Sequence, residues 1–175
     1  MHAGLIRGLA CAGMALLAGG AFAQDSQNRV AAHTDWSVFV ASDPTQCWSV
    51  SGPKETVNTR EGRVVAVNRG DILLFVSFIP GQNVSGQISF TGGYPFRDGS
   101  TVSMDISGTK FELFTDGEMA WSASDSDDSK IITAMKRGSE AVLTAVSSRG
   151  TKTEDTFSLF GFTAAVEEAE KRCSN

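Results

Sequence analysis

Short runs in which every second side chain is apolar dominate the sequence after Trp36, and this pattern constrains the fold more than any other feature. Residues 36–40 and 102–106 are clear examples. A period of two places alternate side chains on one face of a β-strand. The sequence therefore predicts a mainly β protein, either an antiparallel β-sandwich or a flattened barrel. Turn residues separate the runs at intervals of about eight to twelve residues, in the pairs Gly52-Pro53, Pro80-Gly81, Gly92-Gly93, Asp98-Gly99, Ser107-Gly108 and Asp116-Gly117.

Three further patterns refine the predicted sheet. The run Ile72–Ile79 is almost continuously apolar, which predicts a central strand that is buried on both faces. Asp116-Gly117 separates residues 111–114 from residues 119–121 and predicts a hairpin. Residues 141–148 and 153–159 are expected to form the last pair of strands.

Two segments break the alternation and carry helical signals. Residues 125–136 begin with acidic side chains and are followed by a basic residue and a glycine, which suits the two ends of a helix. Residues 159–172 predict a second helix. Its buried face is expected to pack on the sheet near the strand that contains Cys47. That face is an apolar stripe at helical spacing, made of Phe162, Val166, Ala169 and Cys173.

The first 23 residues have the pattern of a cleaved secretory signal peptide. One basic residue precedes the apolar run 8–20, and Ala21-Phe22-Ala23 is a small-x-small cleavage site. An N-terminal membrane anchor is the alternative, but the run is short for a permanent span and no later window is long enough. The expected mature chain has a flexible leader at residues 24–34 and a single β-rich domain at residues 35–175. It is expected in the periplasm, at the outer membrane or outside the cell.

The cysteines and histidines limit the chemistry of the mature chain. Cys11 is lost with the signal peptide, so Cys47 and Cys173 remain. An even pair in an oxidising compartment predicts one disulfide, and two unpaired buried thiols are the alternative. His33 is the one histidine left. This excludes a His-rich zinc site, and a catalytic triad is excluded unless His33 is its base.

The charge balance makes several partners and ligands improbable. The chain has 20 acidic and 15 basic side chains and a formal charge of −5, without a basic block. Such a chain is a poor binder of nucleic acid.

Residues 125–129 resemble the start of a calcium loop, but Lys130 and Lys136 stand where that loop needs glycine and glutamate. No metal ion and no cofactor is therefore predicted.

A polar turn between the last two predicted strands, residues 147–156, is the first candidate binding site. Arg149 would clamp an anionic group through two parallel hydrogen bonds, and Thr151, Thr153 and Asp155 would supply further oriented polar contacts. The alternative is structural. In that case Arg149 pairs with Asp155 and the hydroxyls stabilise the turn through local backbone bonds, as polar turns usually do.

The loop Gly92–Phe96 is the second candidate, because it carries the only tyrosine of the chain. Tyr94 and Phe96 on a glycine-rich loop would form a docking surface for a partner. Alternatively, they cover one end of the core, where large aromatic side chains usually lie. The three tryptophans fall on predicted strands and are expected in the core; they are Trp36, Trp48 and Trp121.

Several pieces spread along nearly the whole mature chain carry a family resemblance: Asp35-Trp36, Cys47, Leu74–Ser77, Gly92–Phe96, Phe111–Phe114, Asp116–Trp121, Ser147–Thr151, Asp155–Leu159, Gly161-Phe162 and Cys173. Together they resemble the invasion-associated locus B family of exported bacterial proteins. The resemblance implies an envelope location and a link to the invasion of host cells by pathogens, although relatives also occur in bacteria without that habit. It supports the disulfide between Cys47 and Cys173 and implies no catalytic or metal-binding residue. One departure is that Val50 lies one place later than the family's Cys-x-Val pattern.

Three functions remain in competition on the sequence alone. The first is a non-enzymatic envelope protein that binds a partner protein or a cell-surface component through the two candidate loops. The second is a periplasmic barrel that holds a small molecule. The third is a hydrolase that uses two carboxylates, which would need a cleft with two suitably spaced acids. The sequence leaves the oligomeric state open.

Overall fold

The computed structural model describes residues 28–43 and 45–174, so the predicted signal peptide, residues 1–23, lies outside the described residues. Two α-helices and a short 3₁₀ turn, η1 (Pro80–Gln82), accompany the strands. The helices are α1 (Asp125–Met135) and α2 (Phe162–Cys173). The strands are β1 (Arg29–His33), β2 (Trp36–Ser42), β3 (Thr45–Ser51), β4 (Glu55–Arg60), β5 (Arg63–Val64), β6 (Leu73–Ile79), β7 (Val84–Thr91), β8 (Thr101–Ile106), β9 (Thr109–Asp116), β10 (Met119–Trp121), β11 (Glu140–Val146) and β12 (Lys152–Ser158).

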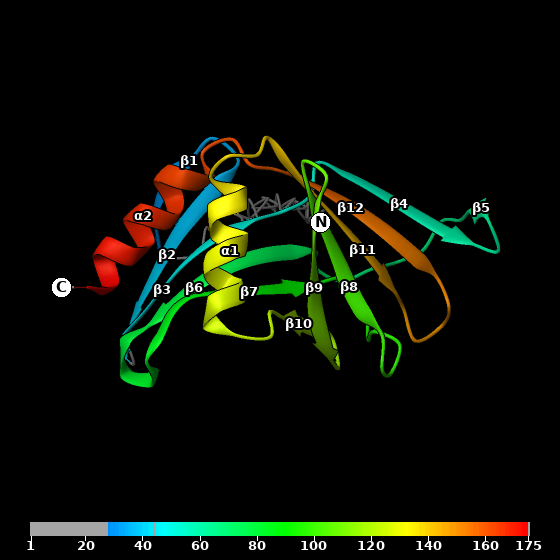
Figure 1. The fold of residues 1–175 in the computed structure, drawn as a ribbon, viewed down its shortest axis with the longest axis horizontal. Coiled ribbons are helices and arrows are strands. Elements are labelled where there is room, and N and C mark those ends of the chain that lie inside the picture. The colour runs from blue at the N-terminus through cyan, green and yellow to red at the C-terminus, as the bar shows by residue number, and fades with distance from the viewer. Residues whose placement is uncertain (1–27, 44, 175) are drawn as a thin grey trace, which may run out of the picture.

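All twelve described strands belong to one antiparallel sheet, in the order β1-β2-β3-β6-β7-β10-β9-β8-β11-β12-β4-β5. The sheet curves strongly, and both helices lie on its concave side (Figure 1). The prediction of a mainly β fold with two helices and a C-terminal helix packed on the sheet is confirmed. The barrel alternative is wrong, because the sheet does not close. Side chains from distant strands meet inside the curve, where Phe90 of β7 packs against Phe157 of β12.

The alternation of apolar residues corresponds to the two faces of this sheet. On β6, Leu74, Val76 and Phe78 are buried on the concave face, whereas Phe75 and Ile79 are half-buried on the other face. The prediction that this strand is buried on both faces is therefore wrong, because helices cover only one side.

The tryptophans divide in the same way between the two faces. Trp36 is buried and makes an edge-to-face contact with Phe162 of α2, with ring centroids 4.9 Å apart. Trp48 and Trp121 are half-buried instead of in the core. Trp48 stacks on Phe39 at 5.5 Å on the uncovered face, where neighbouring strands place the two rings in register.

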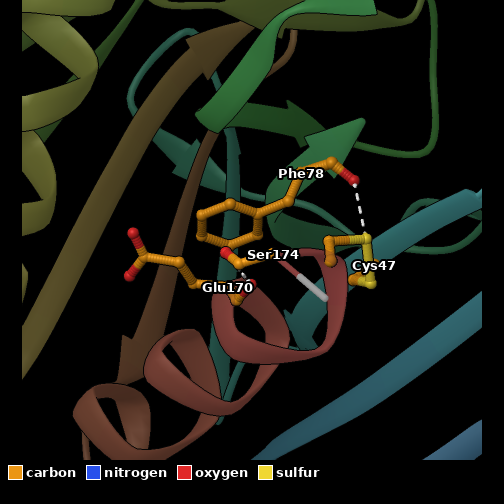
Figure 2. Close-up of a disulfide and its surroundings, with 5 residues drawn as sticks. Cys47, Phe78, Glu170 and Ser174 are labelled. Carbon is orange, nitrogen blue, oxygen red and sulfur yellow. Dashed lines mark hydrogen bonds between the residues drawn. A yellow bond between two sulfur atoms is a disulfide. The ribbon is translucent and has the colours of Figure 1, made fainter. Parts of the chain in front are cut away.

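A disulfide joins the last turn of α2 to β3, as the cysteine count predicted (Figure 2). The sulfur atoms of Cys47 and Cys173 are 2.06 Å apart, and the Cα atoms are 5.8 Å apart. The apolar stripe predicted for this helix faces the sheet. The helix begins at Phe162, later than predicted, because the chain first turns at Gly161. This glycine has φ 88°, and a side chain there would overlap with the carbonyl group of His33.

The leader predicted at residues 24–34 is ordered where the structure describes it. Arg29–His33 forms β1 and pairs with β2. The Nε2 atom of His33 lies 2.6 Å from Glu168 Oε2 of α2, so a side-chain contact adds to the backbone pairing. Part of the predicted leader is therefore an edge strand, which its polar composition did not indicate. Within the described residues, neither helix has the length and apolar character needed to cross a bilayer.

Candidate functional site

A polar cleft of about 470 Å³ opens where segments far apart in the chain meet. Its walls come from the end of β4, the segment that follows β5, the loop after β7 and the turn between β11 and β12. The lining is mostly polar and includes three arginines. The lining residues are Arg60, Val67, Asn68, Arg69, Gly93, Tyr94, Pro95, Glu118, Ser147, Ser148, Arg149, Thr151 and Thr153.

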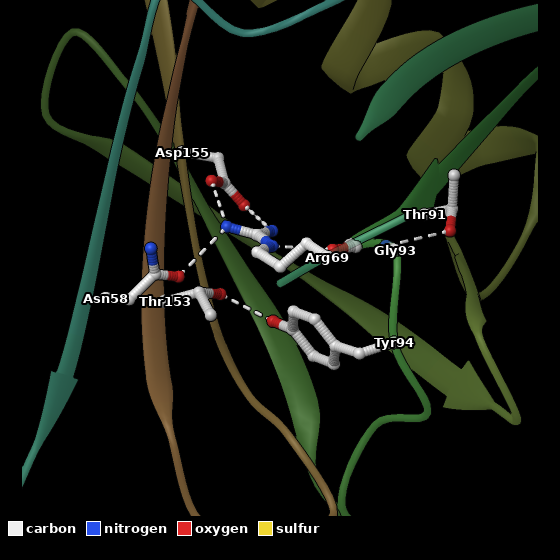
Figure 3. A network of polar contacts seen from close by, with 8 residues as sticks. Asn58, Arg69, Thr91, Gly93, Tyr94, Thr153 and Asp155 are labelled. Atoms are coloured by element: carbon white, nitrogen blue, oxygen red, sulfur yellow. Dashed lines mark hydrogen bonds and ion pairs between the residues drawn. The ribbon is translucent and has the colours of Figure 1, made fainter. Parts of the chain in front are cut away.

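A buried ion pair between Arg69 and Asp155 forms the floor of the cleft (Figure 3). Arg69 Nη1 donates to Asp155 Oδ1 at 2.7 Å, and Nη2 donates to Oδ2 at 2.6 Å. Arg69 also donates to the carbonyl oxygen of Gly92 at 2.8 Å and to the Asn58 side chain at 3.3 Å. The side chain of Asp155 is 0% exposed and that of Arg69 is 6% exposed. Two parallel bonds of this kind fix the guanidinium in one orientation.

Tyr94 closes the floor from the side of the loop. The guanidinium of Arg69 lies 5.0 Å from the centre of the Tyr94 ring, within the range of a cation–π contact. The Tyr94 hydroxyl shares a hydrogen bond of 2.5 Å with the Thr153 hydroxyl. Burial raises the pKa of the Tyr94 hydroxyl, so this group keeps its proton at neutral pH.

The double glycine before Tyr94 allows this close packing. Gly93 has φ 72°, and a Cβ atom there would lie 2.5 Å from the Gly70 carbonyl oxygen. The backbone N–H of Gly70 donates to the Gly93 carbonyl oxygen at 2.9 Å. The loop and the segment that carries Arg69 are thus held together by backbone contact, which positions Arg69 beneath the cleft.

Two arginines lie at the rim of the cleft. Arg60, at the end of β4, donates from Nη2 to the Thr151 hydroxyl at 2.7 Å. Arg149 lies in the β11–β12 turn and is exposed. Neither guanidinium forms an ion pair with any residue that the structure describes. Both therefore present charged donors to the cleft, together with the exposed side chains of Asn68 and Ser148.

The structure brings most of the predicted site residues together at the cleft. Some of them line it, whereas Asp155 is buried and has a structural contact instead of the predicted binding role. Tyr94, Arg149, Thr151 and Thr153 all line the cleft. The alternative pairing of Arg149 with Asp155 is wrong, because Asp155 points to the buried side of β12 and pairs with Arg69. Burial raises the pKa of the Asp155 carboxyl, and the hydrogen bonds from Arg69 oppose that rise.

Phe96 lies in the core and not on the docking surface that was proposed for it. It is 4% exposed and packs against Phe90 and against the edge of Tyr94. Its backbone bridges to Ser147, so the loop after β7 joins the β11–β12 turn. Phe96 thus belongs to the core and packs against the ring of Tyr94.

Arg69, Arg60 and Asn58 were missed by the sequence analysis. Arg69 is 86 residues from Asp155 in the chain, and Arg60 is 91 residues from Thr151. No local pattern marks such pairs. The available signal was weak: a polar stretch, Asn68–Asp71, stands directly before the most apolar strand.

The lining residues limit the chemistry that the cleft can perform. They include one carboxylate, Glu118, and neither a histidine nor a cysteine. The cleft thus offers no pair of lining carboxylates of the kind that a glycoside hydrolase uses. Among residues 28–43 and 45–174, no group of three or more histidine, cysteine or acidic side chains is placed to hold a metal ion. The acidic residues instead lie in the first turn of α1, where they favour the helix N-terminus, and the Ser124 hydroxyl caps the helix by accepting from the Asp127 backbone N–H.

The open curved sheet, the disulfide to the C-terminal helix and the polar cleft define a class of disulfide-linked antiparallel β proteins. Residues 36–170 match the model of the invasion associated locus B (IalB) protein family, and the chain belongs to this family. The resemblance seen in the sequence is confirmed.

A solved structure has the same fold. The crystal structure of invasion associated protein B from Bartonella henselae aligns with a TM-score of 0.57 and 13% sequence identity, over 83% of this chain and 98% of that chain. At this identity the likeness concerns the fold alone. No curated protein matches the sequence.

Proposed function

We propose that this protein is exported to the cell envelope, where it acts as a non-enzymatic interaction module. It binds a partner protein or a cell-surface component at the cleft between the loop after β7 and the β11–β12 turn. The observation that carries the proposal is the combination of a rigid floor, the Arg69–Asp155 pair, with charged donors at an open rim. A preformed site of this kind binds without a large ordering cost.

The charges of the rim support recognition over catalysis. Arg60 and Arg149 supply hydrogen-bond donors with permanent charge, which suits binding and orientation. General acid–base catalysis needs a group that changes protonation near the working pH. Glu118 is the one lining carboxylate, and it is exposed to solvent at the rim.

Two features support export. The first 23 residues have the composition of a signal peptide. The disulfide between Cys47 and Cys173 is of a type that persists in oxidising compartments. The proposed location is the periplasm, with attachment to the outer membrane or release from the cell as further destinations.

Export is tested by fractionation of cells that express the full chain, followed by intact-mass measurement. We expect protein in the envelope or medium fraction, with the mass of residues 24–175 and without reaction of Cys47 or Cys173 with a thiol reagent. Uncleaved protein in the cytoplasm with two reactive thiols would refute this part of the proposal.

Binding is tested by proximity cross-linking in intact cells with a photoreactive group at position 148, which lines the cleft and is exposed. We expect a defined adduct that is lost in Arg149→Ala and Tyr94→Ala. Arg137→Ala, which removes an exposed arginine after α1, should leave the adduct unchanged. An adduct pattern that is the same in all variants would refute binding at this cleft.

A further inference from the structure

The cleft concentrates positive charge in a protein that is acidic overall. The chain has a formal charge of −5, yet three arginines line the cleft beside one glutamate. The charge of Arg69 is balanced by Asp155, which leaves the charges of Arg60 and Arg149 at the rim. Elsewhere, exposed basic side chains do form ion pairs, such as Lys136 with Glu167. The rim therefore attracts an anionic group from outside.

The donors at the rim are held in place before any ligand arrives. The Thr151 hydroxyl accepts from Arg60, so this guanidinium keeps its other N–H groups for a ligand. Arg69 uses four of its five N–H groups on Gly92, Asn58 and Asp155. The remaining N–H group, on Nη2, has no partner among the described residues.

The rest of the lining suits a hydroxylated ligand. Hydroxyl and amide side chains outnumber apolar side chains on the walls, with Ser147, Ser148, Thr151 and Asn68 beside the arginines. A volume of about 470 Å³ lies within the range of small-molecule sites and exceeds what a bare ion needs. An acidic sugar has both an anionic group for the arginines and hydroxyl groups for the polar side chains of the lining.

We propose that the cleft binds a saccharide that carries a carboxylate or a phosphate group. The anionic group contacts Arg60 and Arg149, and the sugar hydroxyls contact the Ser148 and Asn68 side chains. The inference rests on the proposed function, for which it names the chemical class of the cell-surface component. Glu118, which also lines the cleft, opposes anion binding and limits the affinity.

The inference is tested by NMR titration of the purified disulfide-bonded protein with four probes: glucuronate, glucose 6-phosphate, glucose and inorganic phosphate. We expect glucuronate or glucose 6-phosphate to shift the backbone signals of Gly93, Ser148 and Gly150, and to bind at least about tenfold more tightly than glucose and inorganic phosphate. Binding should weaken as salt is added.

Variants of matched charge decide whether the cleft is responsible. Arg149→Gln and Arg60→Gln should each weaken binding about tenfold, as expected for a lost charged hydrogen bond. Arg137→Gln removes the same charge elsewhere and should have no effect. Glu118→Gln should strengthen binding about twofold, because it removes a like charge at the rim. Unchanged backbone spectra without probe confirm that each variant is folded.

Three outcomes would overturn the inference: no binding of either acidic sugar, equal binding of glucose, or equal binding of inorganic phosphate. Binding that survives in Arg149→Gln and Arg60→Gln would also overturn it. A cross-linked protein adduct in cells, together with no sugar binding in vitro, would leave the proposed function standing and remove this inference. Sugar binding in vitro without any adduct at position 148 in cells would support this inference and count against binding of a partner protein at the cleft.

Discussion

The two halves of the concave face are stabilised in different ways. In the helix-covered half, which we define as β2, β3, β6 and β7, α1 and α2 pack over apolar side chains and the disulfide fixes the end of α2. In the cleft half, which we define as β11, β12 and β4, the segment around Arg69 and the Tyr94 loop cover the sheet (Figure 3). The same sheet thus supports an apolar core at one end and a polar site at the other.

The boundary between the halves runs along a single strand. On the buried face of β12, Phe157 packs against Phe90 in the apolar core, whereas Asp155 and Thr153 belong to the polar network. Buried polar groups need partners, and here Arg69 and Tyr94 supply them. The lesson is that a site can be built into the interior of a sheet by changing the side chains at alternate positions of one strand.

The largest effect is expected from breaking the ion pair in the cleft half. Arg69→Leu leaves Asp155 buried without a countercharge and should lower the free energy of unfolding by about 3–5 kcal/mol. Urea denaturation measures the loss. The double variant Arg69→Leu with Asp155→Leu should recover most of it, since no buried charge remains. A double variant as unstable as the single variant would contradict the assigned cause.

The next largest effect is expected in the helix-covered half. Reduction of the disulfide, or its replacement by Cys47→Ala with Cys173→Ala, should lower the free energy of unfolding by about 2–4 kcal/mol. The NMR signals of Gly93 and Tyr94 should keep their positions, because the cleft half does not depend on this bond. Loss of the cleft signals on reduction would show that the two halves are coupled.

A matched pair of hydroxyl deletions sharpens the comparison. Ser49 is buried on β3, and its hydroxyl has no hydrogen-bond partner among the described residues. Ser49→Ala should leave the free energy of unfolding unchanged or raise it by about 1 kcal/mol. Thr153→Val removes the partner of the Tyr94 hydroxyl and should lower it by about 1 kcal/mol. Equal effects of the two variants in thermal denaturation would contradict the contrast between the halves.

The smallest effect concerns acid pH and the contact between β1 and α2. Hydrogen bonds from Arg172 and His33 lower the pKa of Glu168 below its usual value of 4.5. A lowered pKa in the folded state contributes stability above pH 4.5 that is lost as the pH falls through the folded value. Because these groups are partly exposed, the contribution should stay below about 1 kcal/mol. Glu168→Gln should remove this part of the pH dependence. An unchanged acid profile would contradict it.

The sequence predicted local features of the fold and missed those that depend on distant partners. The Asp116-Gly117 turn places β9 beside β10, and residues 125–136 contain α1, because each signal lies within a few residues. The open sheet was not predictable, since closure depends on whether two edges meet in space. β1 was missed because its pairing with β2 is not visible in its polar composition.

The residues of the candidate site show the same difference between local features, which were predicted, and contacts with distant partners, which were not. Arg149, Thr151, Thr153 and Asp155 were found together because they lie close together in the sequence, in the β11–β12 turn and the start of β12. The partner given to Asp155 in the structural alternative was wrong, because Arg149 is near it in the sequence, whereas Asp155 lies on the buried face of β12 and pairs with Arg69. A strand places alternate side chains on opposite faces, so only the structure shows which cation each acid can reach.

The pairing of β4 with β12 has a consequence for how the molecule folds. β12 lies near the end of the chain, and its register sets Asn58 opposite Thr153. Contacts between such distant segments form slowly, because a large loop must close first. We therefore expect the cleft to assemble after the hairpins. A chain without β12 would lack the strand that carries Thr153 and Asp155, so ligand capture by this cleft would report that β12 has joined the sheet.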